Sequence, residues 1–332
     1  MNASEKPIDR HRDSAISMDI GQSDEGGITG TVKFFDRLLI VKEGAIYEML
    51  LADKIDPERK NISIPNAQKR ILTRGSKCKI VSKTLLIADY LFKPKFMPDG
   101  FDYDTAMENT LNITKLLIEM EESCRILEKE ETDIINNLNI IPVRSGYIIP
   151  SIIDLEPRCK SYLQRADHAI VALFNIVRIF YGNKITHADS FLEKINNQNN
   201  RNVQFIGFLT GATPFFRLIR HARNAVEHPK PTERIVIDDF SINPGGKLRN
   251  PSITIFHPAS PIDQISIIDF MDEITKTISE AFEMVLVHMC AEHAKFGAFP
   301  IAIVDNRDIE TGRNNLAFSY AAEIDGKWIP MG

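Results

Sequence analysis

Residues 205–229 read FIGFLTGATPFFRLIRHARNAVEHP, an apolar stretch that closes on a cluster of polar groups. The apolar side chains recur at helical spacing, which predicts an amphipathic helix with an interruption near Gly211. Its buried face is expected to hold Phe215, Phe216, Leu218, Ile219 and Ala222. The rest of the chain must therefore supply partner helices for this face.

Long helical patterns flank this stretch on both sides. One is predicted from an N-cap at Asp104 to about Asn137, and a second from about 154 to 181, where Gly182 ends it. Thr186 is expected to open a short helix. Another helix is predicted to start with Ser260 as N-cap, Pro261 at the first helical position and Asp263 in the first turn, and to run to about His293.

The remaining segments have different characters. Residues 1–27 are predicted to be a mobile arm, and 28–100 a small α/β region of unknown role, with a short helix over 44–51. A helical domain should span 101–297 and contain a β-hairpin near 232–257, because apolar residues alternate there on both sides of Pro244-Gly245-Gly246. Residues 298–332 are predicted to form a short β element, with Trp328 packed. The expected class is mainly α: an antiparallel helical bundle with an inserted β-hairpin, a small α/β N-terminal region and a short C-terminal β element.

Composition limits the function classes. The chain has 332 residues, 43% hydrophobic and 26% charged, and a net charge of −5, so it can bury a core but is not coated with nucleic-acid-binding charge. No apolar run reaches membrane-spanning length, and no apolar signal core opens the chain, so we expect a cytoplasmic protein without a membrane segment. The four cysteines are scattered without CxxC spacing, which favours neither a disulfide framework nor a zinc site.

The six residues Arg223-Asn224-Ala225-Val226-Glu227-His228 carry the chemistry of the chain. Arginine can clamp a phosphate, and histidine can move a proton near neutral pH. On an ideal helix Arg223 and His228 would point roughly 140° apart, so they converge only if the helix ends between them. Pro229 favours such an end, because the residue before a proline leaves the α region. The alternative is that Arg223 and Glu227 form an (i, i+4) pair on a solvated face and that His228 only caps the helix.

The segment from 201 to 234 is locally basic. Its cations are Arg201, Arg217, Arg220, Arg223, Lys230 and Arg234, and its acids are Glu227 and Glu233. Such a patch on an acidic protein suits a confined phosphate site. We therefore expect Arg217, Arg220, His221 and Lys230 to bind RNA phosphate.

The pattern Arg-Asn-x-x-x-His resembles the signature of the HEPN superfamily, in which an Arg, usually followed by a polar residue, precedes a His by four to six residues. The resemblance covers the helical territory from roughly 105 to 295. It implies a helical bundle and an endoribonuclease that needs no metal or other cofactor, with Arg223, His228 and Asn224 as catalytic residues. Some toxins of this superfamily carry a Tyr two residues after the His, where this chain has Lys230.

The resemblance also implies an assembly. Two protomers typically pair their motifs, so we expect a homodimer that acts on RNA in toxin–antitoxin growth control or antiviral defence, with an antitoxin or regulatory partner as a further expectation. The apolar residues around the motif exceed one helical stripe, which also favours a twin helix: Phe205, Ile206, Phe208, Leu209, Phe215, Phe216, Leu218 and Ile219. The competing hypothesis is a helical module that binds RNA or protein without catalysis.

Other candidates are weaker. Asp167 and His168 are neighbours on a helix and point about 100° apart, so a structural role is favoured. Arg165 or Arg178 could face the motif helix. The group of His288, Glu292 and His293 lacks the usual spacing of a helical zinc pair, and we expect no metal there. The basic run of Lys69, Arg70, Arg74, Lys77 and Lys79 is typical of a solvated face, with contact to RNA as the alternative.

Overall fold

The computed structural model of the protein describes residues 7–13, 18–137, 141–143, 146–198, 202–295, 301–306, 316–324 and 326–331. It is 51% helical and 21% strand, so the protein is of mixed α/β class and the prediction of a mainly α protein is wrong. Sequence periodicity underestimated the strands because several of them are short and are stabilised by pairing with distant segments.

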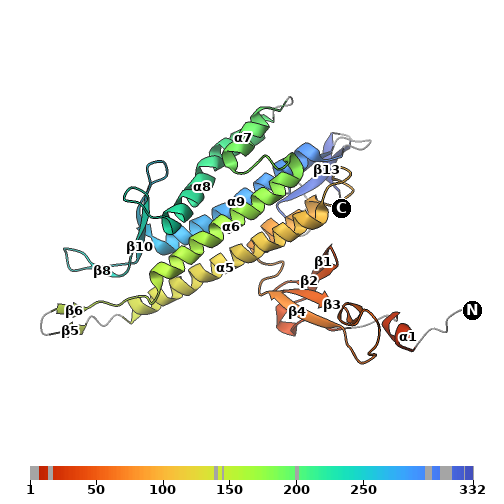
Figure 1. Ribbon diagram of the computed structural model, residues 1–332, viewed down its shortest axis with the longest axis horizontal. Helices are drawn as coiled ribbons and strands as arrows, with labels where there is room; N and C mark the ends of the chain where they lie inside the picture. Colours follow the sequence, from red (N-terminus) through yellow and green to blue (C-terminus); the bar gives the residue numbers. More distant parts are fainter. Residues whose placement is uncertain are drawn as a thin grey trace, which may run out of the picture.

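Three long helices form the centre of the molecule: α5 (Tyr103–Asn136), α6 (Leu155–Tyr181) and α9 (Ile267–His293). They lie side by side, and α5 runs opposite to α6 and α9 (Figure 1). The start of α5 is fixed by Asp102, whose side chain accepts a hydrogen bond from the Thr105 N–H at 3.1 Å. The predicted cap, Asp104, instead accepts from the N–H of Phe35 at 2.8 Å and so ties the helix to the N-terminal sheet.

Two further helices, α7 (Ala188–Asn196) and α8 (Val203–Glu227), lie on the outer side of α6 (Figure 1). The predicted interruption of α8 near Gly211 is wrong, because the helix continues through both Gly211 and Pro214. Pro214 removes one helical hydrogen bond, but it stands on the exposed side. The opposite side is buried against neighbouring helices and holds the helix together across this point: Phe205, Leu209, Thr213, Phe216 and Ile219.

The N-terminal region is an antiparallel sheet of four strands, in the order β1 (Ile28–Phe34), β2 (Arg37–Lys42), β3 (Ile46–Leu50) and β4 (Ala67–Leu72). The prediction of a helix over 44–51 is wrong. Good helix formers fill this segment, but β3 pairs with β2 on one side and β4 on the other and buries Ile46 and Tyr47. Tertiary pairing therefore overrides local propensity. A short helix, α2 (Ala52–Ile55), follows β3.

A continuous helical stretch connects this sheet to the long helices. It consists of α3 (Lys79–Val81), the π-helical η2 (Ser82–Leu86) and α4 (Ile87–Leu91), and it packs on α5 and α9. Val81, Leu85 and Ile87 are fully buried there. One hydrophobic core therefore runs from the sheet into the helices.

The described parts of the first 27 residues contact the sheet region. They include the helix α1 (Pro7–Asp13) and the single turn η1 (Ser23–Glu25). Arg12 lies 3.1 Å from Asp53, and the buried Lys42 ammonium donates to the carbonyl of Gln22 at 2.5 Å.

The predicted β-hairpin is confirmed, because β7 (Arg234–Asp238) pairs antiparallel with β10 (Ser252–Phe256). A two-residue pair, β8 (Ser241–Ile242) and β9 (Leu248–Arg249), lies in the connection between them. The predicted helix start at Ser260 is wrong. Residues Ile262–Ser266 form a third strand, β11, on the free edge of β10, and α9 starts only after Ser266, whose hydroxyl accepts from the Asp269 N–H.

The C-terminal residues form a sheet in the order β12 (Ile301–Asp305), β13 (Phe318–Ile324) and β14 (Lys327–Pro330). The buried Tyr320 anchors it, since its hydroxyl donates to the Leu91 carbonyl at 3.0 Å. Trp328 of β14 is 40% exposed, so it packs only in part. A small pair, β5 (Ile141–Val143) and β6 (Gly146–Ile148), lies between α5 and α6. Among the described residues, none of the helices has the length and apolar character needed to cross a membrane.

Candidate phosphate-binding and catalytic site at the end of α8

The motif helix ends where the sequence predicted. Glu227 is the last helical residue, and His228 follows with φ −133° and ψ 62°, outside the helical region. Its N–H still donates to the carbonyl of Asn224 at 2.8 Å. The imidazole is exposed and makes no hydrogen bond or ion pair with any residue that the structure describes. His228 is therefore accessible from solvent.

Arg223 is held by two carboxylates. Its Nη2 lies 2.8 Å from Glu227 Oε2, one turn further along α8, and its Nε lies 3.7 Å from Asp167 Oδ2 on α6. Its Nη1 also donates to the side-chain oxygen of Asn224 at 3.2 Å. The (i, i+4) pair of Arg223 and Glu227 is thus present. Asp167, for which the sequence favoured only a structural role, adds a contact between α6 and α8.

Asp167 is half-buried, and burial and neighbouring charges have opposite effects on the pKa of its carboxyl. Burial raises its pKa, whereas the nearby charges of Arg223, His168 and Arg220 lower it. Burial is the largest of these effects, so the net shift of the pKa is upward. The pairing with Arg223 is what favours the charged form of this carboxyl.

The predicted phosphate-binding cations differ in availability. Arg217 is paired with Asp189 of α7, and Lys230 lies 2.8 Å from Glu233. Arg220 is exposed and makes no ion pair within the described part of the chain. Arg220 is therefore the most available of the three for an incoming phosphate.

His221 belongs to a small polar cluster beside the motif. Its ring stacks on His257 with centroids 4.0 Å apart, and its Nδ1 lies 3.0 Å from the hydroxyl of Ser260. Burial, followed by the charges of His257, Arg217 and Arg220, lowers the pKa of His221. The imidazole is therefore favoured in its neutral form, which can exchange hydrogen bonds but attracts phosphate weakly.

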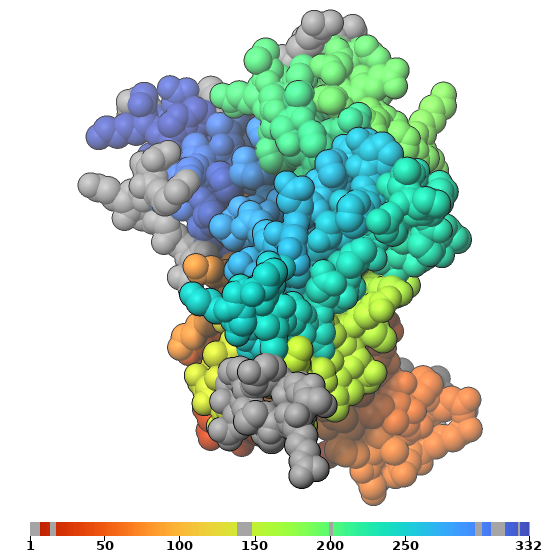
Figure 2. Space-filling view, turned by 90° about the vertical axis from the view of Figure 1, so that its left-hand side faces the viewer, coloured from red at the N-terminus to blue at the C-terminus, as the bar shows by residue number. Residues whose placement is uncertain are grey.

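Sequence reasoning missed His257, Ser260 and the contact of Asp167. His257 and Ser260 lie more than thirty positions after His221 and reach it only because β10 and β11 return beside the end of α8. The β-hairpin pattern was a usable signal for this return. Figure 2 views the end of the molecule where β8 and β10 lie, and α8 and these strands make up much of that face.

The other candidates lie apart from this cluster. Arg165 pairs with Glu119 of α5 at 3.2 Å, and Arg178 donates to the Ile185 carbonyl at 2.7 Å, so neither is bound to the motif. His288 stacks on Phe205, and Glu292 accepts from the hydroxyl of Tyr181 at 2.6 Å. Within the described ranges no group of three or more His, Cys, Asp or Glu residues is placed to hold a metal ion.

Comparisons with known proteins returned no match, whether with protein-family models, with curated proteins or with solved structures. The interpretation of this site therefore rests on the motif and on its geometry.

Proposed function

We propose that the C-terminal end of α8 is the active site of an endoribonuclease of the HEPN type. The observation that carries this proposal is the position of His228: an accessible imidazole just beyond the helix end, in the turn that follows Arg223. Histidine can take or give a proton near neutral pH, and arginine can stabilise charge on a phosphate. Both groups act without a metal.

The reaction that suits these groups is transesterification of RNA. A base removes the proton of a 2′-hydroxyl, the 2′-oxygen bonds to the adjacent phosphorus, and the bond from phosphorus to the 5′-oxygen breaks. An acid then supplies the proton that the leaving oxygen needs. The products are a 2′,3′-cyclic phosphate and a 5′-hydroxyl. His228 serves as one of the two proton-transfer groups, and Arg223 stabilises the charge of the phosphorane.

The carboxylates around Arg223 have two effects on this reaction. Glu227 and Asp167 fix the position of the guanidinium, which lowers the cost of ordering it. They also compete with phosphate for its N–H groups. The side-chain oxygen of Asn224 accepts a hydrogen bond from a further N–H of Arg223. A phosphate oxygen can replace Asn224 as the acceptor of this bond.

One histidine cannot be both base and acid in a single step, which favours a second motif from a twin protomer. The apolar residues that exceed one helical stripe, from Phe205 to Ile219, do not supply the contact between protomers. They are buried or partly buried within the chain itself. A stripe of exposed α8 positions does face outward: Val203, Gly207, Thr210, Pro214 and Arg217. Its next position, His221, is covered by His257, and Asn224 of the motif is exposed again. A Cβ added at Gly207 or Gly211 would meet no atom within 4 Å, so a second helix can approach closely. A homodimer that pairs these stripes would bring Asn224 and His228 toward their copies.

The test is cleavage of bulk RNA in EDTA, with detection of fragments that end in cyclic phosphate. Wild-type protein should cleave, and His228→Ala and Arg223→Ala should each lose at least about a hundredfold in rate, as removal of a proton-transfer or charge-stabilising group does. Arg125→Ala is the matched control, because Arg125 also pairs with a glutamate of its own helix, Glu122, but lies on α5. Cleavage by either motif variant at the wild-type rate would refute the proposed mechanism.

The second candidate is a helical module that binds RNA or protein without catalysis. The short ion pair between Arg223 and Glu227 favours it, since a paired guanidinium is a common structural feature of helix surfaces. The same assay separates the two functions, because cleavage in chelator excludes a purely binding role. Under the nuclease proposal the setting would be the cytoplasm, in toxin–antitoxin control or antiviral defence, with an antitoxin or regulatory protein as partner.

A further inference from the structure

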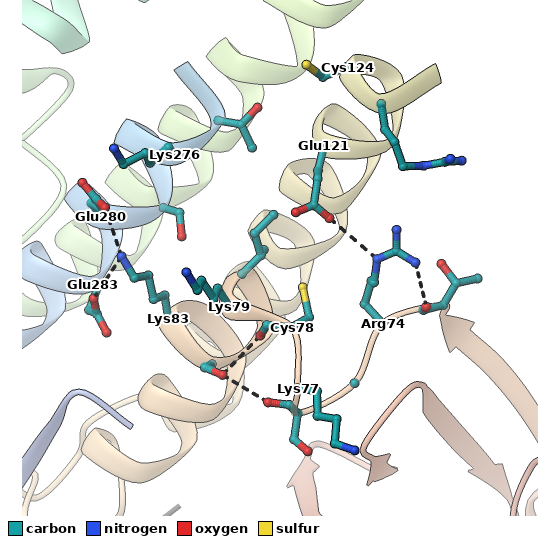
Figure 3. A pocket seen from close by; sticks show the side chains of 18 of the residues that line it. Arg74, Lys77, Cys78, Lys79, Lys83, Glu121, Cys124, Lys276, Glu280 and Glu283 are labelled. Carbon is teal, nitrogen blue, oxygen red and sulfur yellow. Dashed lines mark hydrogen bonds and ion pairs between the residues drawn. The ribbon is translucent and has the colours of Figure 1, made fainter. Parts of the chain in front are cut away.

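A large cavity lies away from the motif. It has a volume of about 1160 Å³ and is bounded by α5, α9 and the loop that joins β4 to α3 (Figure 3). None of the described residues that line it comes from α6 or α8. The cavity is therefore separate from Arg223 and His228, and a ligand bound in it does not depend on nuclease activity.

One end of the cavity has uncompensated positive charge. Most of its cations are paired with carboxylates; for example, Lys83 lies 3.2 Å from Glu280 and 3.9 Å from Glu283. Lys79 and Lys276 line the same cavity but form no ion pair within the described ranges. In Figure 3 the side chains of Lys79 and Lys83 extend toward α9, the helix that carries Lys276. This end of the cavity can therefore attract an anion.

A buried hydroxyl also belongs to the lining of this cavity, on α9 three residues after Lys276. Ser279 is only 4% exposed, and its Oγ has no hydrogen-bond partner among the described residues. Thr275, one turn earlier on α9, satisfies its own hydroxyl by donating to the Met271 carbonyl at 3.0 Å. A buried polar atom without a partner is costly in a folded protein. A ligand oxygen at the lysine end would give Ser279 an acceptor.

The other end of the cavity is acidic. Glu128 and Asp272 line it and form no ion pair with a described residue. Together with Asp269 and Glu121, and after the larger effect of burial, they raise the pKa of the Cys124 thiol to about 12. Asp272 and Ser279 are seven residues apart on α9, which places them about 10 Å apart along the helix axis. Lys276 lies between them, four residues or about 6 Å from Asp272. The unpaired carboxylates and the unpaired lysines of the cavity thus lie within the length of one small molecule.

We propose that this cavity binds a phosphate ester whose far end carries N–H donors, as a mononucleotide does. Its phosphate lies between Lys79 and Lys276 and accepts a hydrogen bond from Ser279. Its amino group donates to Asp272 and Glu128. A charged phosphate is favoured at the basic end, because charge-assisted hydrogen bonds are stronger than neutral ones. N–H donors are favoured at the acidic end for the same reason.

The first experiment compares AMP, ribose 5-phosphate and inorganic phosphate by titration calorimetry with the full-length protein at low salt. AMP should bind saturably and at least about tenfold more tightly than ribose 5-phosphate, since only AMP carries a base with an amino group. No saturable binding of AMP, or equal affinity for AMP and ribose 5-phosphate, would overturn the proposal.

The second experiment uses variants. The double substitution Lys79→Ala with Lys276→Ala should weaken the binding of AMP at least about tenfold. The control Lys160→Ala, at a partly exposed lysine of α6 outside the cavity, should not change it. Ser279→Ala should weaken AMP without lowering the melting temperature, because no internal hydrogen bond of the described chain is lost. Asp272→Asn with Glu128→Gln should reduce the preference for AMP over ribose 5-phosphate. Wild-type affinity in the double lysine variant would contradict the assignment.

Discussion

Asp167 of α6 lies 3.7 Å from the guanidinium of Arg223 on α8, and this contact joins the motif helix to the central helices. Arg223 thereby has one carboxylate on its own helix and one on a neighbouring helix. Glu227 is a local partner that any helix could supply, whereas Asp167 depends on the packing of α8 against α6. The position of the candidate catalytic arginine is therefore a property of the tertiary fold.

This contact predicts the effect of Asp167→Asn. Loss of one competing carboxylate should strengthen RNA binding, so KM should fall a few-fold, while looser positioning of Arg223 should lower kcat. Steady-state kinetics on a short RNA would show that both constants are lower in the variant than in the wild type. Equal kinetic constants in variant and wild type would mean that Asp167 does not act on Arg223.

The helices of this fold could be predicted from sequence, but several strands could not. The long apolar stripes of α5, α6 and α9 have helical period, and Gly182 marks the end of α6 as predicted. Residues Ile46–Leu50 and Ile262–Ser266 are strands because other strands pair with them. Ser260 and Pro261 form a good helix start locally, but β10 offers a free edge that sequence does not show.

Only the local features of the candidate site could be predicted from the sequence. The end of α8 and the position of His228 follow from Pro229, a local signal. The stacking of His257 on His221 and the contact of Asp167 with Arg223 join distant segments, and no spacing rule connects them. The same holds for the basic run near Lys79, which has the pattern of a solvated face although Arg74, Lys77 and Lys79 line a cavity against α5 and α9.

Gly75 should be intolerant of any side chain. A Cβ at this position would lie 2.1 Å from the Lys42 carbonyl oxygen and 2.6 Å from the Ala45 backbone nitrogen. The loop cannot move away, because the N–H of Ser76 donates to the same Lys42 carbonyl at 2.9 Å. Gly75→Ala should therefore destabilise the fold by about 1–3 kcal/mol, as forced overpacking does. Thermal unfolding would measure this, with Gly27→Ala as a control at a position where an added Cβ meets no atom within 4 Å; a similar loss of stability in both variants would contradict the explanation.

Stability should fall as the pH drops through the histidine range. Burial lowers the pKa of His288, and burial with the charges of His257, Arg217 and Arg220 lowers that of His221. The histidines of the unfolded chain therefore take up protons at a higher pH than those of the folded chain. Their contribution to the free energy of unfolding is complete above about pH 6.5 and is lost as the pH falls toward the pKa values of the folded state. His288→Phe keeps a ring against Phe205 and should reduce the loss of melting temperature between pH 7 and pH 5.5. An unchanged pH profile in this variant would exclude His288 as a source of the effect.

The cysteines should differ sharply in reactivity. Cys78 is partly exposed, whereas Cys124, Cys159 and Cys290 are buried. Burial raises the pKa of Cys124 and of Cys159 to about 12, and it also raises that of Cys290, so all three remain protonated thiols at neutral pH. Because only the thiolate reacts at a useful rate, iodoacetamide should label Cys78 first in the native protein. Peptide mass spectrometry after brief labelling at pH 7.5 would show the order, and Cys78→Ser should leave little label until denaturant is added. Early labelling of Cys159 in native conditions would mean that α6 is less tightly packed against its neighbours than its burial indicates.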